Sequence, residues 1–176
     1  MFFKNLDTKR LILKNIGQED AEFILRQFSN DEVNRYLFDE EPYTTIEEAE
    51  KLIQFYTEEE PRYQHRWVLV RKDTGEKMGT CGFHCWNRES QECEMGYDLY
   101  PDYQNHGYMQ EALAAILDFA KTEMHVRRIE VHIAEDNIKS HNTAKRQGFV
   151  DSQQTYNEVF RGKEYLHHIY VLNWTN

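Results

Sequence analysis

Residues 104–109, Gln-Asn-His-Gly-Tyr-Met, have the residue types of an anion-binding loop. A strand-like segment ends at Leu99, a short polar loop follows, and a long helix is predicted to begin near Gly107. Free backbone N–H groups and the positive end of the helix dipole converge at such a junction, so an anion can be held without Lys or Arg. Gly107 would let the backbone approach a diphosphate closely. On these residues alone, an ordinary helix start is the other interpretation.

Other phosphate and metal motifs do not fit. No G-K-[ST] follows Gly107, so the loop is not a P-loop, and the glycines of the dinucleotide fingerprint G-x-G-x-x-G are missing. The three cysteines, Cys81, Cys85 and Cys93, are an odd number, which argues against a disulfide framework. Together with His84 they lack the paired C-x2-C spacing of a zinc site. We therefore expect buried, reduced thiols and no metal.

Apolar periodicity predicts four helices. Two lie in the first third of the chain, over residues 18–28 and from a capping box at Thr44–Glu47 or Thr45–Glu48 to about residue 56. The longest runs from about residue 107 to 124. The shortest spans residues 138–147, with Asn137 as its N-cap and Gly148 as its stop.

Alternating residues and turn signals predict strands at 8–13, 67–70, 77–86, 93–99 and 129–133, and two more that meet at residues 161–163. The element order indicates an α/β fold: a mixed, mostly antiparallel sheet of about seven strands, with helices on both faces and a central βαβ unit. The length of 176 residues fits one domain, residues 1–176, with a core of about 8–174.

Charge and hydropathy narrow the range of partners. The net charge of −10 disfavours nucleic acid and suits a cationic partner. No apolar stretch approaches the roughly 18 residues of a membrane span. The first ten residues lack the apolar core of a signal peptide, so we expect a cytoplasmic protein without membrane association.

Four segments resemble motifs of the GNAT acetyltransferases, in the order and spacing of that family. Residues 104–109 resemble its pyrophosphate loop Q/R-x-x-G-x-G/A, with Met109 departing from the usual Gly or Ala. Residues 94–97 resemble its E-I-G-Y, and residues 137–149 its N-x-x-S…G-F segment. Residues 8–13 look like the opening T-x-R-L-x-L of the ribosomal-protein alanine N-acetyltransferase branch.

The resemblance implies an N-acetyltransferase that moves acetyl from acetyl-CoA, its co-substrate, to a primary amine by direct attack in a ternary complex. The strand before the loop should bulge and splay from the strand over residues 129–133, with the pantetheine arm of CoA threading the gap. By the same resemblance, the CoA-binding residues are Leu99, Tyr100, Gln104, Asn105, His106, Gly107, Tyr108, Met109, Asn137 and Ser140.

Glu94 is the first candidate for the general base, because strand periodicity places it beside the expected splay; a solvated carboxylate is the alternative. Asp98 and Glu130 are weaker candidates. Many family members protonate the CoA thiolate with a Tyr seven residues after the Asn of N-x-x-S, but Ala144 stands there. Ser140 is therefore the candidate proton donor; otherwise it is a hydroxyl in the first turn of a helix.

The acceptor stays open at this stage. The branch resemblance suggests the α-amine of a protein, and the alternative is a small amine such as a polyamine, an amino acid or an aminoglycoside. A catalytically silent acyl-CoA-binding module is a third interpretation, because of Ala144 and Met109. A homodimer is expected only by analogy with the family.

Overall fold

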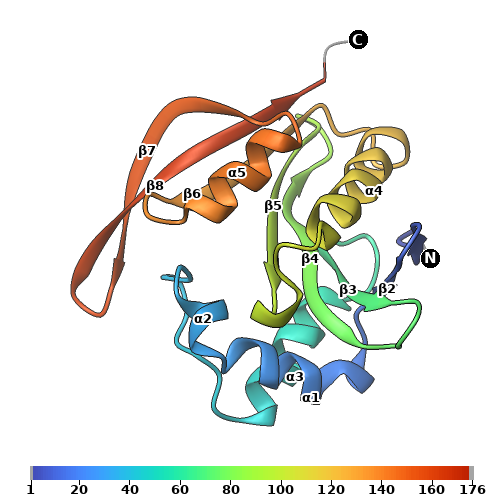
Figure 1. Ribbon diagram of the computed structural model, residues 1–176. Coiled ribbons are helices and arrows are strands. Elements are labelled where there is room, and N and C mark those ends of the chain that lie inside the picture. Colours follow the sequence, from blue (N-terminus) through green and yellow to red (C-terminus); the bar gives the residue numbers. More distant parts are fainter. Residues whose placement is uncertain (1, 175–176) are drawn as a thin grey trace.

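A computed structural model describes residues 2–174. The strands among them form one open eight-stranded sheet. Its strand order is β1-β2-β3-β4-β5-β6-β8-β7 (Figure 1). Every neighbouring pair is antiparallel except β5 and β6, which are parallel. The strands are β1 (Leu6–Asp7), β2 (Leu11–Asn15), β3 (His65–Arg71), β4 (Lys77–Asn87), β5 (Glu92–Leu99), β6 (Arg128–Ala134), β7 (Val150–Phe160) and β8 (Lys163–Asn173).

The predicted α/β class, mixed sheet and four main helices are confirmed. The additional elements are short: β1 has two residues, and α2 has four. The helical elements are η1 (Gln18–Asp20), α1 (Ala21–Phe28), α2 (Asp31–Asn34), α3 (Ile46–Tyr56), η2 (Pro101–Tyr103), α4 (Tyr108–Thr122) and α5 (Ile138–Arg146).

Both faces of the sheet carry a hydrophobic core, because side chains alternate along the central strands. On β3, Trp67 and Leu69 pack into the larger core, to which α4 contributes its apolar stripe. Val68, between them, packs into the second core with α1 and α3. Figure 1 shows α1 and α3 together, well apart from α4 and α5. The predicted cover of helices on both faces is confirmed.

Polar side chains fix the starts of two helices. Thr45 and Glu48 form the capping box of α3. The Asn137 side chain accepts a hydrogen bond from the Ser140 N–H at 3.2 Å, which caps α5 and fixes the position of Ser140.

Strands β5 and β6 separate after a short stretch of pairing. Their ladder joins Glu92 to Arg128, Cys93 to Ile129 and Glu94 to Glu130, and then ends. Beyond Glu94, β5 stays paired with β4 on its other side as far as Leu99, and β6 stays paired with β8. The sheet therefore opens between β5 and β6, and polar backbone groups on both sides of the opening are available to a ligand.

Among residues 2–174, no helix is long and apolar enough to cross a membrane.

Candidate active site

A cavity of about 870 Å³ occupies the region where β5 and β6 diverge. Its walls come from β5, β6, the start of α4, α5 and the segment that joins α1 to α3. Of the residues predicted to bind CoA, eight line it: Leu99, Gln104, Asn105, Gly107, Tyr108, Met109, Asn137 and Ser140. Residues that are far apart in sequence thus meet at one site.

The loop before α4 has the backbone of an anion site. Asn105 has φ 65° and Gly107, the N-cap of α4, has φ 78°. Left-handed residues at such positions turn successive N–H groups toward one side, and the first N–H groups of α4 have no acceptor within the helix. A Cβ on Gly107 would meet only Arg10 Nη2, at 3.5 Å, so its positive φ, rather than lack of space, explains the glycine.

A lysine that the sequence analysis did not select lies beside this loop. Lys139 Nζ on α5 donates to Gln104 Oε1 at 2.7 Å, and the Gln104 side chain in turn donates to the Leu99 carbonyl at 3.1 Å. Arg146, also on α5, lines the same cavity. Lys139 therefore contacts the loop at residues 104–109, and Arg146 adds a second cation to the wall of the same cavity. No motif connects them to residues 104–109, so only the fold brings them together.

The T-x-R-L segment near the start of the chain supports the loop from outside. Arg10 Nε pairs with Glu111 Oε2 on α4 at 2.7 Å, and Arg10 Nη1 donates to the His106 carbonyl at 3.0 Å. The Arg10 guanidinium also lies 4.4 Å from the centre of the Tyr108 ring. These contacts fix the loop against the first turn of α4, a role that the sequence pattern did not reveal.

Tyr100 and His106 are placed differently from the other predicted CoA residues, and neither lines the cavity. The Tyr100 N–H donates to the Met78 carbonyl at 2.8 Å, and its carbonyl accepts from the Tyr103 N–H at 3.0 Å. Its backbone therefore has no free donor for a pantetheine arm. The His106 side chain is exposed and turns back onto the Gln104 carbonyl at 2.7 Å.

Met109 does not obstruct the loop with its side chain. It is 8% exposed and packs in the larger core. The departure from Gly or Ala at this position is therefore accommodated below the loop.

Glu94 stands where β5 and β6 part, and its side chain lines the cavity. Its Oε2 lies 3.0 Å from His84 Nε2 on β4. An ionised carboxylate can only accept, so His84 carries its proton on Nε2. This hydrogen bond, with the electrostatic effect of His84 and His132, lowers the pKa of Glu94 despite partial burial. Glu94 is therefore a carboxylate at neutral pH and can accept a proton or hold an ammonium.

The weaker base candidates are engaged in other interactions, although Asp98, like Glu94, lines the cavity. Asp98 is buried, pairs with Arg66 at 3.4 Å and accepts hydrogen bonds from Thr80 and Gln27. Burial raises the pKa of Asp98, against the opposing effect of Arg66. Glu130 pairs with Arg128 at 2.6 Å and is outside the cavity wall. Asp98 thus belongs to a buried polar network, and Glu94 is the best-placed carboxylate of the three.

Ser140 has a partner that the sequence analysis missed. Tyr97 Oη on β5 lies 2.9 Å from Ser140 Oγ on α5, and both residues line the cavity. Burial raises the pKa of Tyr97 to about 12, so its phenol stays protonated at neutral pH. Ala144, where many family members carry a tyrosine, is 1% exposed and packed in the larger core. A phenol is thus present near the expected thiolate, but it comes from β5.

The expectation of buried thiols is right for Cys81 and Cys93 and wrong for Cys85, which is exposed. The β4–β5 ladder shifts register between His84 and Asn87, and Cys85 has φ 52°. The bulge breaks the alternation of side chains and turns Cys85 out of the core.

Comparison with known proteins agrees with this geometry. The family model of the acetyltransferase (GNAT) domain matches residues 10–150, and the chain belongs to the GNAT acetyltransferase family.

Among its relatives, YoaA of Bacillus subtilis, described as an uncharacterised N-acetyltransferase, is 34% identical over 84% of this chain and 83% of its own. The spermidine N(1)-acetyltransferase of Vibrio cholerae is 24% identical over 93% of each chain. A crystal structure of spermidine N-acetyltransferase from Vibrio cholerae in complex with CoA and spermine superposes with a TM-score of 0.82 at 22% identity, covering 93% of this chain and 95% of that one. The chain is an N-acetyltransferase; its acceptor is a separate question.

Proposed function

We propose that the protein transfers acetyl from acetyl-CoA to a cationic primary amine, with both substrates bound at once in the cavity between β5 and β6. The observation that carries this proposal is the opening of the sheet after Glu94, with the anion loop at residues 104–109 at the edge of the same cavity. The CoA diphosphate would lie on the loop and the first turn of α4, near Lys139 and Arg146. The pantetheine arm would lie along β5.

The proposed reaction uses Glu94, where β5 and β6 separate, and the pair of hydroxyls on Tyr97 and Ser140. An ammonium loses its proton to Glu94, directly or through water, and the free amine attacks the thioester carbonyl. The tetrahedral intermediate then loses the second N–H proton of the attacking amine and collapses, the C–S bond breaks, and CoA leaves as a thiolate. The Ser140 hydroxyl, which is hydrogen-bonded to Tyr97, gives its proton to the thiolate, and the proton lost by the nitrogen returns to Ser140 through the Tyr97 hydroxyl or water. The products are an acetamide and CoA thiol, and Glu94 releases its proton to solvent.

Two basic residues, Lys139 and Arg146, line the α5 wall of the cavity, where the CoA phosphates would lie. Away from α5, at what we call the acceptor end, carboxylates outnumber cations among the lining residues: Glu32, Asp39, Glu40, Glu41, Glu94, Asp98 and Glu158, against Arg35 and Arg66. An acceptor that carries a second positive charge would be attracted to this acidic end. The net charge of −10 acts in the same direction. Both a polyamine and the α-amine of a basic peptide meet the requirement, and the spermidine acetyltransferase relatives support the former.

An acceptor panel tests the proposal. CoA thiol release should be fastest with spermidine or with a short basic peptide that has a free α-amine, and slow with neutral monoamines. Glu94→Gln should lower kcat about 100-fold or more, the usual contribution of a general base. The matched control is Glu92→Gln, an exposed carboxylate two residues earlier on β5 that does not line the cavity.

Two outcomes would overturn the proposal. One is acetyl-CoA binding without turnover on any amine, which the silent binding module predicts. The other is an equal loss of activity in Glu94→Gln and Glu92→Gln, which would remove Glu94 from the reaction.

A further inference from the structure

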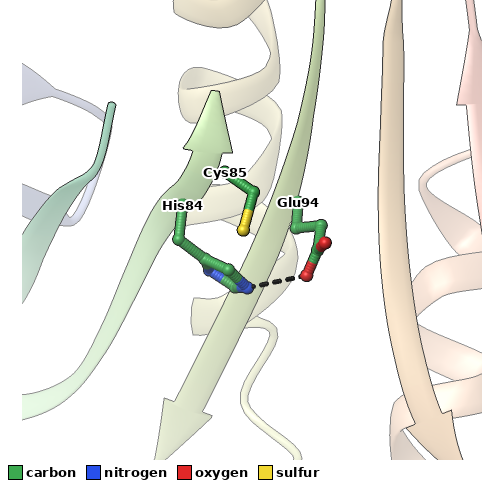
Figure 2. A group of neighbouring side chains, drawn as sticks. All are labelled: His84, Cys85 and Glu94. Carbon is green, nitrogen blue, oxygen red and sulfur yellow. Dashed lines mark hydrogen bonds and ion pairs between the residues drawn. The ribbon is translucent and has the colours of Figure 1, made fainter. Parts of the chain in front are cut away.

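The bulge in β4 creates a cluster of three different metal-binding side chains. In a regular strand, His84 and Cys85 would point to opposite faces. With Cys85 at φ 52°, both side chains turn toward Glu94 on β5 (Figure 2). Left-handed backbone at a residue other than Gly, Asn or Asp is uncommon. Other residues of this chain share it, namely Gln91, His125, Gln153 and Arg161. The side chains that the bulge brings together, rather than its backbone, therefore indicate a site.

The distances suit a single ion. One ring nitrogen of His84, the Cys85 sulfur and a Glu94 oxygen all lie within 4.8 Å of one another, and His84 Nε2 is 3.0 Å from Glu94 Oε2. Ligand atoms about 2.0–2.3 Å from a tetrahedral zinc ion lie roughly 3.3–3.6 Å from each other. Small side-chain rotations would close the wider separations. His84 and Glu94 are partly exposed and Cys85 is exposed, so an ion can reach them.

The set of ligands selects the kind of ion. Thiolate and imidazole favour zinc and similar soft or borderline cations over magnesium or calcium, which require mostly oxygen ligands. Three protein ligands leave a fourth tetrahedral position open, as in zinc sites that bind an exchangeable molecule. His84 and Glu94 line the cavity, so that position would be accessible from the acceptor end.

We propose that His84, Cys85 and Glu94 form a zinc-binding site at the acceptor end of the cavity, and that zinc bound there reversibly blocks acetyl transfer. On binding, Cys85 releases its thiol proton to solvent and binds as thiolate. His84 binds through Nε2 as neutral imidazole with its proton on Nδ1, and no electron is transferred. The spacing of the Cys and His residues predicted no metal, because one ligand of this site is a carboxylate from the neighbouring strand.

Inhibition follows from the shared residue and rests on the proposed function. If Glu94 is the base, a zinc ion on its carboxylate removes the proton acceptor and places a positive charge where the ammonium must approach. Zinc should therefore compete with the amine and leave acetyl-CoA binding intact.

The test uses the full chain without a histidine tag. Cobalt(II) replaces zinc as a spectroscopic probe, because a cobalt–thiolate bond adds a charge-transfer absorption in the near ultraviolet. We expect this absorption to saturate at one equivalent and to be displaced by zinc. Cys85→Ser should abolish it. Loss of a residue that only hydrogen-bonds to a metal ligand already lowers metal affinity about 10–100-fold. Because His84 would itself be a ligand, His84→Gln should weaken cobalt binding at least as much.

The matched control is His125→Asn, which removes an exposed imidazole outside the cavity and keeps a residue type that tolerates its φ of 55°. It should bind cobalt as the unaltered chain does. The site is refuted if no thiolate absorption appears, or if Cys85→Ser keeps it. A saturating thiolate signal with no effect of zinc on acetyl transfer would support the site and refute inhibition through Glu94, so the two proposals fail separately.

Discussion

The contact between Tyr97 and Ser140 gives a quantitative prediction for the leaving group. Their oxygens are 2.9 Å apart, and the protonated Tyr97 phenol can orient the Ser140 hydroxyl toward the thiolate. Ser140→Ala removes the group that donates the proton, so we expect kcat to fall about 100-fold, or about 2.7 kcal/mol in activation free energy. Tyr97→Phe removes only the orienting hydrogen bond. At about 0.5–1.5 kcal/mol for such a bond, kcat should fall about 2- to 13-fold.

The double variant separates proton donation from unrelated damage. If Tyr97 acts through Ser140, then Tyr97→Phe should cost nothing further once Ser140 is Ala, and the coupling free energy should equal the whole Tyr97→Phe effect. The assay is steady-state thiol release at saturating amine, with kcat and the KM for acetyl-CoA measured for all four proteins.

The control is Tyr170→Phe. Tyr170 Oη is also buried and bonds His141 Nδ1 at 3.1 Å, but Tyr170 does not line the cavity. Its loss should leave kcat unchanged. Additive effects of Tyr97→Phe and Ser140→Ala would show that the two hydroxyls act independently, and that Tyr97 does not act through Ser140.

Two further predictions concern ligand binding and stability. Gly107→Glu places a side chain at a backbone φ of 78° and a negative charge on the loop at residues 104–109, so it should abolish the increase in melting temperature given by acetyl-CoA. The control is Gly75→Glu, at φ 75° in the β3–β4 turn. It carries the same backbone cost and should keep the thermal shift. If both variants kept the shift, residues 104–109 would not hold the diphosphate. His65 is 1% exposed, and burial lowers its pKa to about 2. Only the unfolded chain then takes up a proton as the pH falls below about 6.5, so the free energy of unfolding should fall by about 2 kcal/mol between pH 7 and pH 5 through this residue. Urea titrations of the unaltered chain and His65→Gln should differ by this pH dependence, and parallel curves would contradict it.

The elements that the sequence predicted best are those with long periodic signals. The apolar stripe of α4 and the Asn137 cap of α5 each gave a helix within a few residues of its observed bounds. In contrast, β1 and α2 span two and four residues, too few for a period to show, and they are held by their neighbours in the fold.

The site was predicted in part, for a similar reason. Residues 104–109 are contiguous, so their motif is visible in the sequence. Tyr97 and Ser140 are 43 positions apart and come together only because β5 and α5 border one cavity. Cys85 was misassigned because strand alternation assumes a regular ladder, and a bulge with positive φ has no clear sequence signal. Tyr100 was selected by resemblance, but whether its N–H is free depends on its pairing with β4.

Hydrogen exchange with and without acetyl-CoA would locate the CoA site in the chain without knowledge of the acceptor. Saturating acetyl-CoA should slow amide exchange in three segments: residues 95–99 of β5, residues 131–134 of β6 and the loop at 105–110. The β3–β4 turn and the β7–β8 turn should be unaffected. Protection confined to other parts of the chain, or none at all at saturating ligand, would contradict a CoA site in the opening between β5 and β6.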